Sequence, residues 1–102
     1  KNMRGGPGEV IIKHYFRQEE INPHCRLCAQ LTIAPGAGIG SHEHAREDEV
    51  FIIQQGRGIV QQDGREVEVG VGDALVTGKG AAHSIRNNGS EDLIVTAVII
   101  LE

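Results

Sequence analysis

The chain has 102 residues and a mass of 11.0 kDa, which is enough for one small domain and too little for two. Ten Lys and Arg against 14 Asp and Glu give a net charge of −4, so the chain lacks the broad positive field that binds nucleic acids and anionic membranes. No apolar run approaches the roughly 18 residues of a membrane span, no secretory signal is visible, and two Cys are too few for a disulfide-rich scaffold. We therefore expect one cytoplasmic domain that binds neither nucleic acid nor membrane.

The composition favours short β-strands joined by tight turns, because the chain has 14 Gly but only one Tyr, two Phe and no Trp. We expect residues 1–8, with Gly5-Gly6-Pro7-Gly8, to form a flexible lead-in before a domain over residues 9–102. Residues 17–25 are predicted to form a connection. Strands are predicted over residues 9–16, 26–33, 39–44, 49–55, 58–62, 65–69, 74–77, 82–86 and 92–101. This pattern predicts an all-β sandwich or barrel of jelly-roll type.

Two local patterns add detail to this prediction. Alternating apolar residues place one face of the 26–33 strand in the core, namely Leu27, Ala29, Leu31 and Ile33. Asp63-Gly64 predicts a two-residue hairpin, and Asn88-Gly89 is a second turn signal of the same kind.

The last predicted strand is apolar from Leu93 to Leu101 except at Thr96. Such a run predicts that the core or a second subunit covers both of its faces. Together with the hydrophobic 10–16 segment, it predicts a homodimer in which paired strands hide an exposed edge.

The candidate metal-binding residues begin with His42 and His44. On a strand, their side chains are expected to leave the same face, with Cα atoms roughly 6–7 Å apart. A turn through residues 45–48 could bring Glu49 beside them, and His83 is the only other His in the second half of the chain. Three imidazoles and one carboxylate suit divalent Mn, Fe, Co, Ni, Cu or Zn and suit Ca or Mg poorly. Such a set leaves one or two coordination positions for a ligand.

These residues resemble the two motifs of the cupin family. The first motif, G-x5-H-x-H-x4-E-x6-G, is matched at every fixed position by Gly36, His42, His44, Glu49 and Gly56. The second, G-x5-P-x-G-x2-H-x3-N, is matched by Gly72, Gly80, His83 and Asn87, with Gly78 in place of its Pro. The resemblance implies a jelly-roll barrel, often dimeric, with a metal in its mouth bound by His42, His44, Glu49 and His83.

Several functions fit this resemblance. One is a metalloenzyme of dioxygenase, decarboxylase, lyase or isomerase type that acts on a small carboxylate, keto-enol or sugar-like molecule. A second is a binding or sensing module that holds an anion without converting it, and a third is a barrel that its metal only stabilises. Oxalate decarboxylases are similar in fold and ligands, but they place an arginine where this chain has Ile39, and their Glu follows one residue sooner. These differences argue against that activity and leave oxalate as a bound anion at most.

Other residues give weaker indications. Phe51 shares the face of Glu49 and is predicted to form a pocket wall, with Ile53 and Gln55 behind it. Arg26 and Tyr15 are further candidates for contact with an anionic or oxygen-rich ligand.

Two more segments favour structural roles. Cys25 and Cys28 are three residues apart, hence on opposite faces of a strand, so one buried Cys and one rim thiol are expected instead of a metal or redox pair. Arg46-Glu47-Asp48 is predicted to be a solvated loop that could also rim the pocket.

Overall fold

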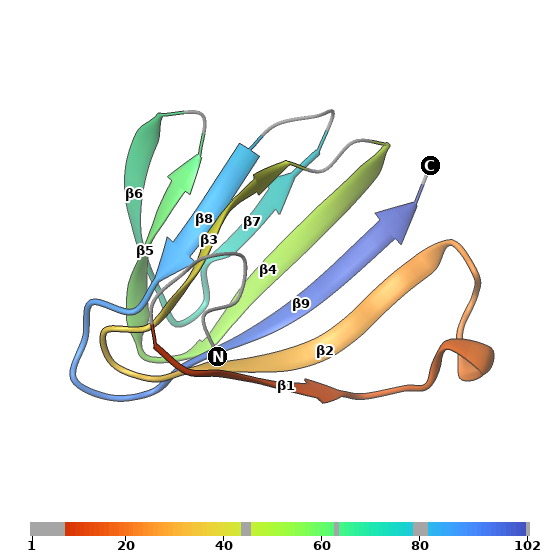
Figure 1. The fold of residues 1–102 in the computed structure, drawn as a ribbon, viewed down its shortest axis with the longest axis horizontal. Coiled ribbons are helices and arrows are strands. Elements are labelled where there is room, and N and C mark those ends of the chain that lie inside the picture. Colours follow the sequence, from red (N-terminus) through yellow and green to blue (C-terminus); the bar gives the residue numbers. More distant parts are fainter. Residues whose placement is uncertain (1–7, 44–45, 63, 79–81, 102) are drawn as a thin grey trace.

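The computed structural model describes residues 8–43, 46–62, 64–78 and 82–101 (Figure 1). Its nine strands in these residues are β1 (Val10–His14), β2 (Cys25–Ile33), β3 (Gly38–Glu43), β4 (Glu47–Gln55), β5 (Arg57–Gln62), β6 (Arg65–Gly70), β7 (Ala74–Thr77), β8 (Ala82–Arg86) and β9 (Leu93–Leu101). A single 3-10 turn, η2 (Gln18–Glu20), lies in the connection from β1 to β2. Residues 1–7 of the predicted lead-in lie outside the described residues.

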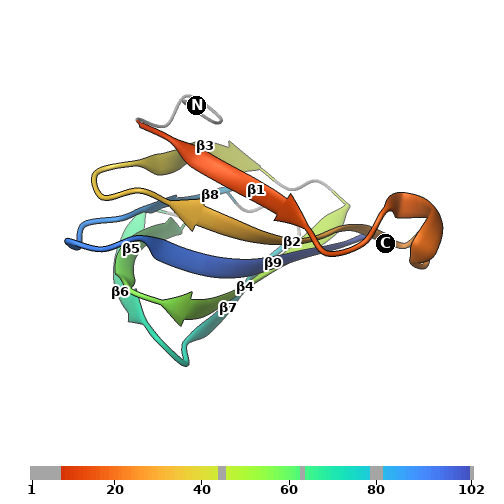
Figure 2. The same ribbon diagram turned by 90° about the horizontal axis from the view of Figure 1, so that it is seen from below.

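Two antiparallel sheets form the domain. One has the order β1-β2-β9-β4-β7 and the other β3-β8-β5-β6. Figure 1 shows the five strands of the first sheet side by side, and Figure 2 shows η2 at the same end of the molecule as the end of β9. A hydrogen bond of 2.6 Å from the Leu101 amide to the His24 carbonyl ties these two segments together. The predicted all-β jelly-roll fold is confirmed.

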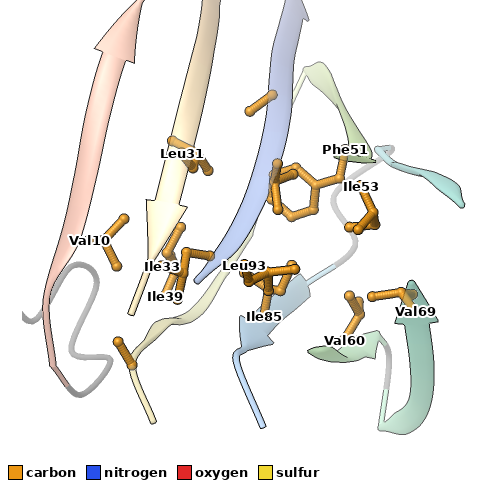
Figure 3. Packing of buried hydrophobic residues seen from close by; sticks show 13 residues of the cluster. Val10, Leu31, Ile33, Ile39, Phe51, Ile53, Val60, Val69, Ile85 and Leu93 are labelled. Carbon is orange, nitrogen blue, oxygen red and sulfur yellow. The ribbon is translucent and has the colours of Figure 1, made fainter. Parts of the chain in front are cut away.

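The core lies between the two sheets and is built from alternate residues of the strands (Figure 3). Ala29, Leu31 and Ile33 of β2 are buried, and Leu27 packs against them, so the predicted inward face of this strand is confirmed. Burial of these branched side chains is the main stabilising contribution, at about 1.5–3 kcal/mol for each large one. The floor of the site described below is therefore apolar.

The hairpin predicted at Asp63-Gly64 joins β5 to β6, where Gln62 pairs with Arg65 and Gly64 has a φ of +80°. Asp63 itself lies outside the described residues. The prediction of a second hairpin at Asn88-Gly89 is wrong, because β8 and β9 belong to different sheets. Instead, the side chain of buried Asn87 donates hydrogen bonds to the carbonyls of Ile33 and Glu91, which fixes this crossover between the sheets.

Strand β4 differs from its prediction at both ends. It begins at Glu47, so Glu47 and Asp48 are strand residues and not a solvated loop. An irregularity between Ile53 and Gln55 shifts the pairing with β9, and Gln55 is exposed instead of following Ile53 into the core. Glu49, Phe51 and Ile53 keep the predicted common inward face.

Only one face of β9 enters the core. Leu93, Val95, Ala97 and Ile99 are buried, whereas Ile100 is 46% exposed on the other face. The prediction that the core covers both faces is therefore wrong, and cover by a second subunit stays a prediction. In the described part of the chain, no helix is long and apolar enough to cross a membrane.

Candidate functional site

A buried carboxylate and a buried imidazole meet between the two sheets. Glu49 Oε1, from β4, lies 2.9 Å from His83 Nε2, from β8, and their side chains are only 6% and 1% exposed. Both strands bring these residues inward because each lies on the core-facing alternation of its strand. Two of the four predicted metal ligands thus face each other in a site shielded from water.

A hydroxyl and an amide hold the other side of His83. Its Nδ1 lies 2.9 Å from Oγ1 of Thr77, which is itself buried on β7. The side-chain amide of Gln62 donates to this hydroxyl oxygen at 2.7 Å and to the Val76 carbonyl at 3.2 Å. Since a hydroxyl can donate or accept, Thr77 can support either tautomer of His83.

Phe51 forms the apolar wall of the site. Its ring stacks on the His83 imidazole with centroids 5.1 Å apart and planes 12° from parallel. Phe51 is 2% exposed, so the stack fixes the imidazole plane within the core. The pocket wall predicted at Phe51 therefore lies against a predicted metal ligand.

Only the backbone is described for His42, and His44 lies outside the described residues. The register of β3 and β8 pairs His42 with His83 directly, after an irregularity between Ile39 and His42. Among the described residues, no group of three or more His, Cys, Asp or Glu side chains is placed to hold a metal ion. The convergence of all four predicted ligands is therefore still a prediction.

The described half of the site fits a divalent transition metal in its donor chemistry. Imidazole nitrogen and carboxylate oxygen are donors that Zn, Fe, Ni and Mn accept, and here both are buried and adjacent. When the Nδ1 proton points to Thr77, the Nε2 lone pair of His83 faces the Glu49 side. A ligating imidazole is usually oriented by such a hydrogen bond at its other nitrogen.

An ion pair lies at the head of β4, close to this site. Arg26 on β2 donates from Nε and Nη2 to the two carboxylate oxygens of Glu47, at 3.0 and 2.9 Å. The hydrogen bond to Glu47 raises the pKa of Arg26 most strongly; partial burial lowers it, and the charges of Glu47 and then Glu49 raise it further. Arg26 therefore remains charged, within electrostatic range of the predicted metal ligand Glu49.

The three candidate ligand contacts do not share one pocket. Tyr15 and Arg26 line a cavity of about 420 Å³ beneath the connection from β1 to β2. Phe51 lies instead against His83 in the core. Thr77 and Gln62 were not predicted from the sequence, and Glu47 was predicted only as part of a loop that could rim the pocket. Its signal was its place two residues before Glu49, on the same face of a strand.

Cys25 and Cys28 are free thiols. Both are half-buried, so the prediction of one buried and one exposed side chain is wrong. The irregular pairing of β2 between Cys25 and Leu27 breaks the alternation on which that prediction depended. The Cys25 thiol donates to the Leu27 carbonyl at 3.3 Å.

Known proteins resemble this chain along most of its length. A Thermotoga maritima protein named oxalate-binding protein is 41% identical over 100 residues, which cover 98% of this chain and 83% of that protein. A solved structure of a predicted oxalate decarboxylase from Thermotoga maritima superposes with a TM-score of 0.96 at 40% identity, covering 99% of this chain and 88% of that chain.

A more distant structure shares the fold alone. The cupin domain of an XRE family transcriptional regulator from Enterobacter cloacae has a TM-score of 0.79 at 18% identity, covering 91% of this chain and 97% of that chain. The profile of the family described as Cupin domain matches residues 29–99. That match, with the close relative aligned along nearly the whole chain, shows that the chain belongs to the cupin family.

Proposed function

We propose that this chain is a metal-dependent cupin that binds a small carboxylate, keto-enol or sugar-like molecule in its barrel. One divalent transition ion, of Mn, Fe, Co, Ni, Cu or Zn, is held by His42, His44, Glu49 and His83. The observation that carries this proposal is the buried contact of 2.9 Å between His83 Nε2 and Glu49 Oε1. The pairing of His42 with His83 across β3 and β8 supports it.

The bound ion supplies Lewis acidity, or redox chemistry if it is iron, manganese or copper. The chain's own residues prepare the site for this ion. Thr77 orients the His83 ring, and Phe51 excludes water from one face of it. Glu49 supplies a negative charge that only a cation or a proton can balance in so buried a place.

An anionic ligand is supported by the close relative, which is named an oxalate-binding protein. Ile39 is buried in the core, so this position gives the site no positive charge. The charge of Glu49 contributes to the raised pKa of Arg26, so this cation lies within electrostatic reach of Glu49. We therefore assign anion recognition to Arg26 and Tyr15 in the cavity that they line, whereas Phe51 forms the wall at His83 in the core.

The alternative is a binding or sensing module in which the same site holds the anion without converting it. The name of the same relative, which states binding and not turnover, favours this candidate. Incubating the metal-loaded protein with oxalate distinguishes the two. Release of CO₂ and formate supports a decarboxylase, whereas saturable binding with oxalate recovered intact supports the module.

A titration of chelator-treated protein with Zn²⁺ and Mn²⁺ tests the metal site. We expect one equivalent to bind wild type, and Glu49→Gln, His83→Gln and His42→Ala each to lower the affinity by at least the 10–100-fold typical of outer-shell changes. His24→Gln is the matched control, because His24 is exposed and precedes β2, a strand that carries none of the four predicted ligands. One equivalent bound by His83→Gln with wild-type affinity would refute the ligand assignment.

Metal removal separates this proposal from a purely structural ion. We expect the chelated barrel to remain folded, because its cluster of buried hydrophobic residues packs together without a metal. Loss of the cooperative thermal transition on chelation would instead indicate that the metal only stabilises the fold. A homodimer and a cytoplasmic location remain predictions.

A further inference from the structure

The cavity lined by Tyr15 and Arg26 lies outside the proposed metal site. It has a volume of about 420 Å³ and is lined by residues 14–18, 20–21 and 26–28, on the end of β1, the connection with η2 and the start of β2. Neither Glu49 nor His83 lines it. Its volume falls within the range of about 300–1,000 Å³ that is usual for small-molecule pockets, and far exceeds what oxalate alone would fill.

Arg26 gives this cavity an available cation. Glu47 accepts hydrogen bonds from Nε and Nη2, which uses two of the five N–H groups of the guanidinium. The Arg26 side chain is 44% exposed, whereas that of Glu47 is 13% exposed. Glu47 therefore holds the guanidinium in place, and three of its N–H groups are not used by these two hydrogen bonds.

The other two Arg or Glu residues of the lining, Arg17 and Glu20, balance each other. Arg17 lies 3.8 Å from Glu20 and 3.7 Å from Glu19, and Glu20 also accepts a hydrogen bond from the Arg17 amide. Arg26 differs because its partner Glu47 does not line the cavity. The lining thus carries one positive charge that a ligand anion can approach.

Besides His14, Gln18 and Cys28, the rest of the wall consists of apolar and aromatic side chains. Tyr15 and Phe16 are two of the three aromatic residues of the chain, and they are 43% and 50% exposed beside the cavity. Ile21 and Leu27 complete this wall. An apolar group that covered these side chains would remove them from water, which is favourable in proportion to the buried area.

We propose that this cavity binds a small carboxylic acid with an apolar body, its carboxylate on Arg26 and its body against Tyr15, Phe16 and Ile21. This inference deepens the proposed function, on which it rests for the anionic class of the ligand. It places recognition of the carboxylate beside the buried metal site and predicts that acids larger than oxalate bind better than oxalate.

Phenylacetate is the probe that tests this site, with 2-phenylethanol lacking the carboxylate and acetate lacking the apolar body. In amide-resolved NMR titrations of ¹⁵N-labelled protein, we expect phenylacetate to shift residues 15–21 and 26–28 saturably. We expect both partial analogues to bind at least about tenfold more weakly, since a charge-assisted hydrogen bond and an apolar contact each contribute about that factor.

Substitutions identify the residue that carries recognition. Arg26→Gln is expected to weaken phenylacetate binding at least about tenfold, and Arg26→Lys to recover part of it by keeping the charge without the planar fork. Arg65→Gln, on exposed β6, is the matched control and is expected to bind like wild type. Equal affinity for phenylacetate and 2-phenylethanol, or unchanged affinity in Arg26→Gln, would overturn the proposal.

Titrations with and without one equivalent of Zn²⁺ separate this site from the metal site. If phenylacetate binds but added Zn²⁺ does not, only the proposed metal site is refuted. If Zn²⁺ binds but phenylacetate produces no shifts, only the proposed cavity site is refuted. Shifts of residues 15–21 that follow protein concentration without any acid would show that a second copy covers the cavity, and would also overturn the proposal.

Discussion

At the scale of single residues, His83 is the best-defined group of the site because both ring nitrogens and one ring face are engaged. Glu49 lies at Nε2, Thr77 at Nδ1 and Phe51 on the ring face. A side chain fixed in this way loses little conformational freedom on binding a ligand. The ring is therefore preorganised for whichever cation or proton sits beside Glu49.

Thr77→Val tests this preorganisation. The change keeps the shape but removes the hydroxyl, so His83 Nδ1 and the Gln62 amide lose their shared partner in a buried place. We expect a loss of about 1–3 kcal/mol in the free energy of unfolding measured in urea, and about 10–100-fold weaker metal binding. Thr96→Val, on the outward side of β9, is the matched control and should leave metal binding unchanged. Metal affinity equal to wild type in Thr77→Val would show that the hydroxyl does not orient the ring.

Gly56 is a second residue whose identity the structure dictates. Its φ is +80°, and a Cβ there would lie 2.7 Å from the Asp92 carbonyl oxygen. Gly64 has the same φ of +80° but open space around it. We expect Gly64→Ala to lower stability by about 1 kcal/mol through backbone strain alone, and Gly56→Ala by about 2–4 kcal/mol, because the clash adds to the strain. Thermal unfolding of the two variants compares them directly, and equal losses would contradict the predicted clash.

At the scale of elements, the pair of Arg26 and Glu47 joins two strands that are not neighbours. In the five-stranded sheet β9 lies between β2 and β4, and Glu47 pairs with Leu101 at the end of β9. The ion pair therefore links β2 to β4 across the end of β9. The ion pair thus connects Arg26, which lines the cavity of about 420 Å³, to β4, the strand that carries Glu49.

A double-mutant cycle with Arg26→Gln and Glu47→Gln measures this tie. Because Arg26 is 44% exposed, solvent screens the pair, and we expect a coupling of only about 0.5–1 kcal/mol. The coupling should shrink in 1 M salt, where charges are screened within about 3 Å. The coupling is obtained from the free energies of unfolding in urea, at low and high salt, of wild type, both single variants and the double variant. A coupling that high salt leaves unchanged would indicate packing of the Arg26 stem instead of charge.

Most strand positions could be predicted from the sequence, because apolar alternation and Gly-containing turns are local properties. The buried face of Ala29, Leu31 and Ile33 is an example. The errors lie where tertiary contacts override the local pattern. Polar Glu47 joins β4 because it pairs with Leu101 and Arg26, and Gln55 turns outward because of an irregularity in its pairing with β9.

The residues of the site also fall into two groups, those that the local sequence predicts and those that only the fold brings together. Glu49 and His83 could be predicted because the motif spacing names them, and the structure places them in contact. Thr77 and Gln62 could not be predicted, because the local sequence around a polar strand residue does not indicate which imidazole it will contact. Only the folded arrangement of β5, β7 and β8 brings these side chains together.

At the scale of the whole molecule, the outer face of the five-stranded sheet carries exposed apolar side chains. Its apolar residues include Ile11, Ile52, Val76 and Ile100, which are 37–61% exposed. Exposed apolar side chains on several adjacent strands are typical of surfaces that bind another protein.

Sedimentation at micromolar concentration tests the predicted homodimer. We expect a species of twice the 11.0 kDa chain mass for wild type and a monomer for Ile100→Lys, because a charge buried without a partner opposes association. Val67→Lys, at a similarly exposed residue on β6 of the other sheet, should remain dimeric. A wild-type chain that sediments as a monomer would contradict the prediction.

The central place of β9 has a consequence for biosynthesis. This strand is synthesised after the other eight strands of the described residues, yet it lies between β2 and β4 and pairs with both. Until residues 93–101 emerge, β2 and β4 each expose one full row of unsatisfied amides and carbonyls to solvent. The nascent chain therefore completes its larger sheet only after translation of this segment, and truncation by even these few residues would leave two aggregation-prone halves.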